Sequence, residues 1–232
     1  MKVLVFGGTT EGRLLARELS ALGAQVTVSV ATALGAEELR GVPPLTVCVG
    51  RKDARQMREM LPGFAVCVDA THPYAAEASG NIRAACLAAG VPYRRLLRGA
   101  SALPPDSVVV PDAPAAARWL AGTQGNILLA TGAKELAAFA GLDAERLYPR
   151  VLPTHEGLAA CEAAGVPHGN IIALQGPFTR ELNEALMRRF DIGYLVTKDG
   201  GAAGGFAEKV QAAADTGAQL VVLRRPPETG ET

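Results

Sequence analysis

Short apolar runs alternate with alanine-rich stretches of helical character along almost the whole chain. The apolar runs lack the strict apolar–polar alternation of a strand with one solvated face, so they indicate strands that are buried on both faces. Strands that alternate with helices predict parallel sheets covered by helices. We therefore expect an α/β protein made of two Rossmann-like parallel-sheet units with helices on both faces.

The expected elements fall into two series. In the first half, strands are expected at 2–6, 25–30, 45–49, 65–68 and 92–97, and helices at 11–22, 53–61 and 75–89. In the second half, strands are expected at 108–110, 127–130, 146–151, 171–174, 194–197 and 219–223, and helices at 112–120, 135–140, 155–164, 180–189 and 206–215.

A loop rich in Pro, Ser and Gly at 99–105 separates the two series. We expect an N-terminal dinucleotide-binding domain over 1–100 and a C-terminal substrate-side domain over 101–226. The polar segment 227–232 is expected to be a disordered tail. The length of 232 residues suits one large domain or two small ones.

The first expected strand leads directly into Gly7-Gly8-Thr9-Thr10-Glu11-Gly12 and then into a helix. Free N–H groups and the positive end of a helix dipole bind phosphate at such a turn, and glycine lets the backbone approach a pyrophosphate closely. Gly7 and Gly12 fit the first and last positions of GxGxxG, while the middle glycine is shifted to Gly8. The loop predicts a site for a nucleotide pyrophosphate, and a tight βα turn without a ligand is the alternative.

The second expected strand ends without the carboxylate that holds the ribose hydroxyls of NAD. The run is Val28-Ser29-Val30-Ala31-Thr32, and the next acid is Glu37. Small hydroxyl side chains such as Ser29 leave room for a 2′-phosphate. We therefore expect NADPH as the cofactor, with NADH as the alternative, and Arg13 or Arg51 as the source of positive charge.

The fourth expected strand ends in Asp69-Ala70-Thr71-His72-Pro73-Tyr74. In a doubly wound sheet this loop lies at the carboxyl edge beside the first glycine loop, where ligands bind. We favour a role in the site for His72, although a histidine that caps the following helix or a backbone carbonyl is the alternative. His155 is expected to be an early-helix residue and His168 a solvated turn residue, and the histidine spacing predicts no metal site.

Three further strand ends in the second half carry glycine loops. They are Thr131-Gly132-Ala133-Lys134, Gln175-Gly176-Pro177-Phe178-Thr179 and Thr197-Lys198-Asp199-Gly200-Gly201, the last followed by Gly204-Gly205. If the strands are parallel, these loops share one edge of the sheet and bring Lys134 and Lys198 to it. Such an edge suits an anionic ligand better than an apolar one, although each loop by itself also fits an ordinary βα turn.

Composition narrows the classes of function. Lys and Arg number 23 and Asp and Glu also 23, so no general attraction to nucleic acid or to an anionic membrane is expected. No apolar run is long enough to span a bilayer, and no signal-peptide core follows Met1, which predicts a cytoplasmic protein with reduced cysteines. The chain contains no GxSxG, GxxxxGK[ST] or HExxH motif, so acyl transfer, P-loop phosphoryl transfer and zinc hydrolysis have no support.

Taken in order, the five loops that start at Gly7, Asp69, Thr131, Gln175 and Thr197 resemble those of the precorrin-6A reductases of cobalamin biosynthesis. The resemblance extends from residue 2 to about residue 226. It implies a nicotinamide-dependent enzyme that reduces one C=C bond of the corrin-precursor macrocycle by hydride transfer, converting precorrin-6A to precorrin-6B. The substrate is metal-free in one branch of the pathway and carries cobalt in the other, and both remain open.

Under this hypothesis the cofactor lies against Gly7–Gly12, Ser29 and Thr71. A general acid, for which His72, Tyr74 and Lys198 are the candidates, or else solvent protonates the carbon next to the one that receives hydride. Arg150 and Arg180 are expected near the carboxylates of the substrate. The expected substrate-binding residues are Lys134, Gln175, Gly176, Lys198, Asp199, Gly201, Gly204 and Gly205.

Other functions stay open at this point. A reductase of another small cyclic substrate, such as an imine, would oxidise NADPH without accepting a corrinoid. A non-catalytic dinucleotide-sensing module would bind the cofactor without hydride transfer, and a scaffold protein would do neither. Beyond the tetrapyrrole substrate, transient contact with other cobalamin-pathway enzymes is the expected partnership.

Overall fold

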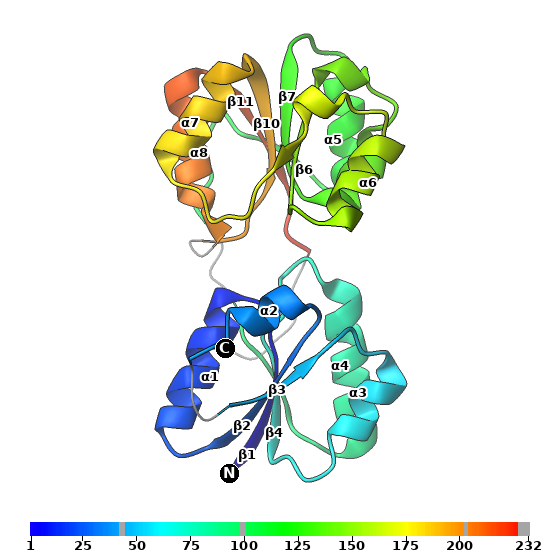
Figure 1. Ribbon diagram of the computed structural model, residues 1–232, viewed down its shortest axis with the longest axis vertical. Coiled ribbons are helices and arrows are strands. Elements are labelled where there is room, and N and C mark those ends of the chain that lie inside the picture. Colours follow the sequence, from blue (N-terminus) through cyan, green and yellow to red (C-terminus); the bar gives the residue numbers. More distant parts are fainter. Residues whose placement is uncertain (42–44, 98–100, 202–203, 227–232) are drawn as a thin grey trace. The chain divides into compact units, whose positions relative to one another are not determined.

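The computed structural model describes residues 1–41, 45–97, 101–201 and 204–226 (Figure 1). The chain divides into two compact units, of which the first contains residues 1–98 and the second residues 99–225. Pro226, which we expected at the end of the second domain, groups with the first unit. The expected tail at 227–232 and the residues 98–100 at the expected boundary lie outside the described residues.

A parallel sheet forms the centre of the first unit. Its strands are β1 (Lys2–Phe6), β2 (Gln25–Val30), β3 (Leu45–Val49), β4 (Val66–Asp69) and β5 (Tyr93–Arg95). They lie in the order β3-β2-β1-β4-β5, and the pairings of β1 with β2 and with β4 are both parallel. The helices of this unit are α1 (Thr10–Ala21), α2 (Ala33–Glu37), α3 (Ala54–Met60) and α4 (Ala76–Ala89).

The packing of β1 explains why this strand reads as an unbroken apolar run. Val3 and Val5 enter a core that contains Ala16 of α1. Leu4 and Phe6 point to the other face, into a core formed with α3 and α4. Helices therefore cover both faces of the sheet, with α1 on one side and α3 and α4 on the other (Figure 1).

The second unit repeats this architecture with a different strand order. The elements are β6 (Val108–Val110), α5 (Ala113–Leu120), β7 (Asn126–Ala130), η1 (Ala133–Phe139), η2 (Ala144–Arg146), β8 (Leu147–Val151), α6 (His155–Ala163), η3 (His168–Asn170), β9 (Ile172–Ala173), α7 (Arg180–Arg189), β10 (Ile192–Lys198), α8 (Phe206–Thr216) and β11 (Gln219–Leu223). The strands lie in the order β6-β11-β10-β7-β8-β9, again with parallel pairings. Helices α7 and α8 lie on one face, and α5 and α6 on the other (Figure 1).

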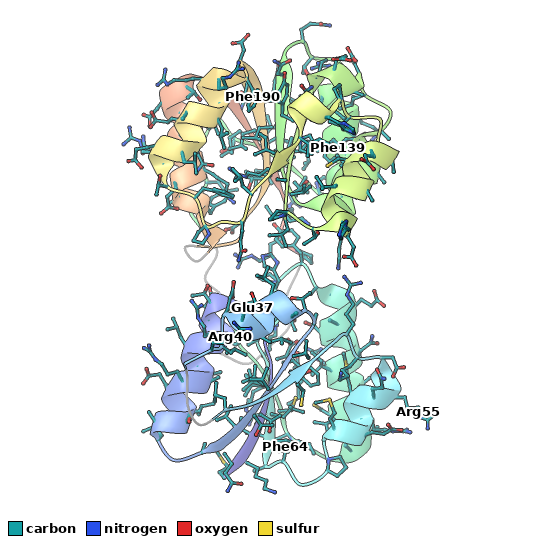
Figure 2. The ribbon with its side chains drawn as sticks, in the orientation of Figure 1. Glu37, Arg40, Arg55, Phe64, Phe139 and Phe190 are labelled. Carbon is teal, nitrogen blue, oxygen red and sulfur yellow. The ribbon has the colours of Figure 1, made fainter. Side chains whose placement is uncertain are left out.

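The predicted fold class, with parallel sheets and helices on both faces, is confirmed, but two local elements differ from the sequence prediction. The segment expected as an α-helix at 135–140 is the 3₁₀ helix η1. A 3₁₀ helix has three residues per turn, so the buried side chains Leu136 and Phe139 fall on the same face, and Phe139 points into the core (Figure 2). The other difference is α2, a short helix that we did not expect, in which Thr32 caps the N-terminus by accepting a hydrogen bond from Gly35 N at 3.2 Å.

Candidate functional site

Strands β1 and β4 are neighbours in the first sheet, and the chain leaves them in opposite directions, toward β2 and toward β5. This is a topological switch point, where open α/β sheets bind ligands at the carboxyl ends of the strands. The loop after β1 and the loop after β4 meet there, because Thr9 Oγ1 donates a hydrogen bond to Ala70 O at 2.8 Å. The same hydroxyl oxygen accepts from Gly12 N at 3.1 Å, which caps α1. The expected adjacency of the two loops is therefore confirmed.

Each glycine of the first loop meets a different geometric demand. A Cβ at Gly7 would lie 3.0 Å from Val28 Cγ1, and a Cβ at Gly12 would lie 2.9 Å from Ala70 Cβ. Gly8 has a φ of +105°, which side chains rarely adopt, and open space above it. The loop thus packs tightly against the sheet at both ends and exposes bare backbone in the middle, where a pyrophosphate would approach.

The first glycine loop borders a small hollow on the β2 side. Gly7, Gly8 and Thr9 line it together with Arg13 and Glu38. Arg51, the other predicted source of positive charge, is exposed and does not line this hollow. Ser29 is buried within β2, and its carbonyl accepts a hydrogen bond from Gly7 N at 2.9 Å. Glu38 is a candidate site residue that sequence reasoning missed, because it follows the unexpected helix α2.

A buried ion pair holds the loop after β4. Asp69 is completely buried, and its Oδ1 accepts from Arg95 Nη1 at 2.8 Å and from Thr71 Oγ1 at 2.7 Å. Its Oδ2 accepts from the Tyr93 hydroxyl at 2.9 Å. Burial, together with the neighbouring charge of Asp69, raises the pKa of Tyr93, so the phenol stays a hydrogen-bond donor. Asp69 therefore acts as an internal anchor, and Thr71, a predicted cofactor contact, is part of the same network.

His72 and Tyr74 lie together in this loop and are both partly buried. Tyr74 N donates to His72 Nδ1 at 3.3 Å, and the ring centroids are 5.5 Å apart. Helix α4 begins after the N-cap residue Ala75, and the role of His72 in the site stays a prediction. The two predicted proton donors are thus brought together beside the first glycine loop.

The second sheet has a switch point of its own between β7 and β10, since β7 leads to β8 and β10 leads to β11 on the other side. The loops after these strands carry Lys134 and Lys198. Lys198 Nζ donates to Glu135 Oε1 at 2.7 Å, which joins the two loops, while Lys134 is exposed. The predicted gathering of these loops at one edge is confirmed for β7 and β10.

Asp199, predicted to bind substrate, is held by groups of its own unit. Its carboxylate accepts from Ser101 Oγ at 2.7 Å, from Gly201 N at 3.1 Å, and pairs with Arg225 Nη2 at 3.2 Å. Burial raises the pKa of Asp199, but hydrogen bonds from Ser101 and Gly201 and the charge of Arg225 outweigh it and lower this pKa. The residue is an ionised anchor for the loop that contains Gly201.

The third predicted loop, after β9, lies over a buried arginine. Gln175 and Gly176 are exposed, and a Cβ at Gly176 would lie 2.8 Å from the Phe178 ring. This ring stacks on the guanidinium of Arg150, with the carbon Cζ 4.1 Å from the ring centroid. Gly204 is exposed, and Gly205 precedes α8 with a φ of +62°. Arg180 pairs with Glu184 at 2.8 Å and with Asp215 at 2.7 Å on the helix surface, and its expected place near substrate stays a prediction.

Lys209 of α8 was missed by sequence reasoning although it is buried. A signal for it exists in the sequence, because Phe206, Lys209 and Ala213 follow the i, i+3, i+7 spacing of an inward helix face. A lysine on such a face is rare, since burying an ammonium group without a partner is unfavourable. Among the described residues, no group of three or more His, Cys, Asp or Glu side chains is arranged to hold a metal ion.

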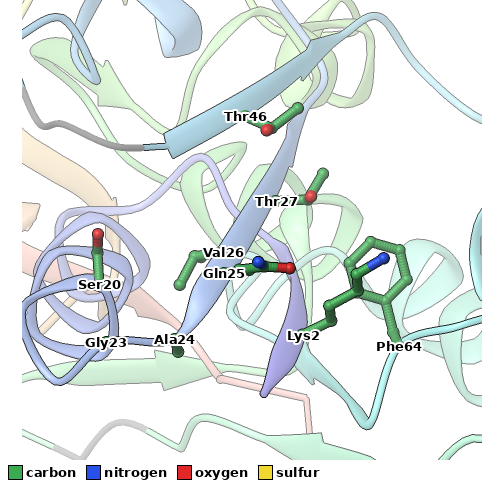
Figure 3. A pocket seen from close by; sticks show the side chains of 9 residues that line it. All are labelled: Lys2, Ser20, Gly23, Ala24, Gln25, Val26, Thr27, Thr46 and Phe64. Carbon is green, nitrogen blue, oxygen red and sulfur yellow. The ribbon is translucent and has the colours of Figure 1, made fainter.

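A larger pocket of about 510 Å³ opens at the opposite edge of the first sheet. Its lining includes Lys2, Gln25 and Phe64, and Figure 3 shows these side chains at the start of β1 and β2 and in the loop before β4. Ligands of open α/β sheets bind at the carboxyl ends of the strands. We therefore place the candidate site at the switch points and not in this pocket.

Comparison with known proteins gives a full-length relationship. Residues 2–232 match the model of a family described as precorrin-6x reductase CbiJ/CobK. The cobalt-precorrin-6A reductase of Priestia megaterium is 35% identical over 97% of this chain and 90% of that protein. The cobalt-precorrin-6A reductase of Salmonella typhimurium is 38% identical over 97% and 87%, and the precorrin-6A reductase of Rhodobacter capsulatus is 30% identical over 97% and 88%.

A solved structure supports the same relationship. The structure titled CobK precorrin-6A reductase superposes with a TM-score of 0.81 and 29% sequence identity, covering 99% of this chain and 90% of that one. No helix within the described ranges is long and apolar enough to cross a membrane. The order of loops noted in the sequence and the fold that carries them lead to one conclusion, which is that the chain belongs to the precorrin-6x reductase family.

Proposed function

We propose that this protein reduces precorrin-6A, or the cobalt-bearing form of the same macrocycle, by transfer of a hydride from a reduced nicotinamide dinucleotide to one C=C bond. The observation that carries the proposal is the match over residues 2–232 to a family of precorrin-6x reductases. Relatives named for the cobalt form and relatives named for the metal-free form both cover 97% of the chain. Both forms therefore belong in the test.

The first glycine loop supports a dinucleotide site in the first unit. Bare backbone at Gly8 and the N-terminus of α1 suit a pyrophosphate. Arg13 suits the 2′-phosphate of NADPH, whereas Glu38 on the same hollow suits the free ribose hydroxyls of NADH. We propose NADPH as the physiological cofactor. A charge-assisted hydrogen bond from the Arg13 guanidinium to the 2′-phosphate is stronger than a neutral hydrogen bond from a hydroxyl group. The bound cofactor supplies the hydride, and the protein supplies position and charge.

The reaction also needs a proton at the carbon next to the one that receives hydride. His72 and Tyr74 are our first candidates, because they lie together beside the proposed cofactor loop. Lys198 is the third candidate, and its ion pair with Glu135 holds its ammonium group in place at the edge of the second sheet. Proton transfer by a positioned side chain contributes about 10²–10⁴-fold to the rate.

The test is anaerobic incubation of the purified protein with precorrin-6A, or with cobalt-precorrin-6A, and NADPH or NADH. Loss of the nicotinamide absorbance at a stoichiometry of one per reduced macrocycle, with the mass of the product increased by two hydrogen atoms, is the expected result. Oxidation of the nicotinamide cofactor by a simple cyclic imine, but by neither form of precorrin-6A, would show that the protein is a reductase of another substrate. Cofactor binding without oxidation by any acceptor would support a sensing module instead.

A further inference from the structure

Two cations are buried beneath α7 and α8 in the second unit. Arg150 is 7% exposed and Lys209 is 9% exposed. Tyr148, two residues before Arg150 on β8, packs in the core formed with Phe206 of α8, so this face of β8 points toward the helices. Lys209 projects from the buried face of α8 that also carries Phe206, so it points from the helix layer toward the sheet.

In the described part of the chain, the two cations lack the negatively charged partners that buried charges normally have. Arg150 Nη1 donates to Asn183 Oδ1 at 2.8 Å and its guanidinium stacks on Phe178, but neither contact supplies negative charge. Within the described ranges, no carboxylate lies at ion-pair distance from Arg150 or Lys209. Buried charges are ordinarily paired, and leaving one unpaired is strongly destabilising.

The carboxylates nearest to the two cations do not neutralise them. Asp199 is near enough to influence Lys209, but Ser101, Gly201 and Arg225 already hold its carboxylate. Glu208 also influences Lys209, and its buried Oε2 has no hydrogen-bond partner among the residues that the structure describes. Arg150 adds repulsion, so Lys209 is surrounded by opposing influences and not by a matched pair.

The position of the pair is that of a ligand site. Arg150 lies near the carboxyl end of β8, and Phe178 comes from the loop that follows β9, at the same edge of the sheet. Asn183, which fixes the guanidinium, is completely buried, and its amide donates to Thr179 O at 2.8 Å. The arginine is thus held between a ring and an amide, through its stacked guanidinium plane and through Nη1.

We propose that Arg150 and Lys209 form the binding site for a carboxylate arm of the macrocyclic substrate, with Phe178 and Asn183 as positioning residues. This inference rests on the proposed function for the identity of the ligand, and on the buried cations for the presence of an anion site. An incoming carboxylate would supply the negative charge that the fold leaves out. A bidentate guanidinium contact with a second charge beside it gives both affinity and orientation.

The binding test uses a stable probe, the polycarboxylate porphyrin uroporphyrin, in the absence of any reaction. We expect Lys209→Met and Arg150→Gln each to weaken its binding about 10-fold to 100-fold, the effect of losing a hydrogen bond to a charged group. Lys209→Arg, which keeps the charge, should retain most of the affinity. Arg118→Met removes one positive charge from the exposed face of α5 and should leave binding unchanged. The affinity for NADPH should be the same in all variants.

Three results would overturn the inference. Unchanged uroporphyrin binding in both Lys209→Met and Arg150→Gln would show that the cations do not contact the ligand. A selective loss of NADPH affinity would assign the site to a phosphate of the nucleotide. A melting temperature of ligand-free Lys209→Met below that of the wild type would make Lys209 a structural residue, since removing an unmatched buried charge should stabilise the free protein.

The inference and the proposed function fail in different ways. If the wild type binds uroporphyrin through Arg150 and Lys209 but reduces neither form of precorrin-6A, the anion site stands and the proposed reaction fails. If the wild type turns over and Lys209→Met keeps both its KM for the macrocycle and its uroporphyrin affinity, the reaction stands and this site is wrong. A raised KM with little change in kcat for Lys209→Met is the expected kinetic result.

Discussion

At the scale of the residue, Lys209 makes stability depend on pH. Burial, reinforced by Arg150, lowers the pKa of Lys209 to about 8, while Glu208 and Asp199 oppose that shift. The unfolded chain binds the proton up to the ordinary pKa of 10.5, so above about pH 8 the unfolded state holds more protons than the folded one. Stability from this group therefore rises as the pH increases from about 8 to about 10.

The measurement is urea unfolding followed by fluorescence of Trp119, the single tryptophan, which lies on α5 of the second unit. Relative to Lys209→Met, we expect the wild type to gain up to about 3 kcal/mol of unfolding free energy between pH 7 and pH 10, because the pKa of Lys209 is 10.5 in the unfolded chain and about 8 in the folded protein. Parallel curves for the two proteins across this range would contradict the buried, protonated lysine.

Two residues on the hollow beside the first glycine loop should decide between the cofactors. Arg13 and Glu38 carry opposite charges there. We expect Arg13→Ala to raise the KM for NADPH about tenfold or more, with little effect on NADH, because one charge-assisted contact to the 2′-phosphate is lost. Glu38→Gln should weaken NADH selectively. Arg51→Ala, at an exposed position that does not line the hollow, is the matched control. Equal effects of Arg13→Ala on both cofactors would place Arg13 at the pyrophosphate instead.

Residue types and their order in the sequence were enough to name the loops but not the burial of single side chains. Thr9 and Gly12 could be placed at the turn because a strand, a glycine turn and a helix leave few geometries. The sequence could not show whether Asp69 is a structural anchor or a reacting group, since its partners Arg95 and Tyr93 come from a strand more than twenty residues away. Lys209 stood in a visible apolar helix face, but its burial depends on how α8 packs on β11 and α7.

At the scale of the element, the loop between β4 and α4 depends on Asp69. Replacement by Asn would keep the shape but leave the charge of Arg95 buried without its ion-pair partner at 2.8 Å. We expect Asp69→Asn to lose about 3–5 kcal/mol of unfolding free energy, the usual result of breaking a buried pair. Circular dichroism during urea unfolding measures this loss.

Asp53 offers a matched comparison for the carboxylate of Asp69. It caps α3 on the exposed side by accepting from Gln56 N at 2.8 Å. Loss of such a cap in Asp53→Ala should destabilise the protein by about 1 kcal/mol. Similar losses for the two variants would mean that Asp69 contributes no more to stability than a surface carboxylate.

We also expect Asp69→Asn to lower kcat, because the loop that contains His72 begins at Asp69, the last residue of β4.

Strands were the most predictable elements, since burial on both faces leaves a run of apolar residues that few other structures produce. β1 and β11 begin and end where the pattern placed them. The shortest elements were the least predictable. α2 has five residues and no buried side chain, so no periodic apolar signal marks it. η1 has the composition of an α-helix, and only the packing of Leu136 and Phe139 shows its three-residue period.

At the scale of the whole molecule, the two units share an architecture but differ in the groups that they carry near the carboxyl ends of their strands. The first offers bare backbone, a helix N-terminus and a histidine loop at β1 and β4. The second offers Lys198, and Arg150 and Lys209 deeper in the same unit. This difference supports a nucleotide in the first unit and a polycarboxylate in the second, and it predicts that each ligand protects its own unit.

Hydrogen exchange measured by mass spectrometry separates these two contributions. NADPH at 100 times its Kd should stabilise the conformation that binds it by about 2.7 kcal/mol and slow amide exchange in segments 7–13 and 69–74. Uroporphyrin should slow exchange in segments 149–151, 176–183 and 205–209 and leave the first two unchanged. Protection of segment 205–209 by NADPH in the absence of the porphyrin would reverse the assignment of ligands to units. Since local opening controls exchange, the pattern reports which residues each ligand contacts or orders without requiring turnover.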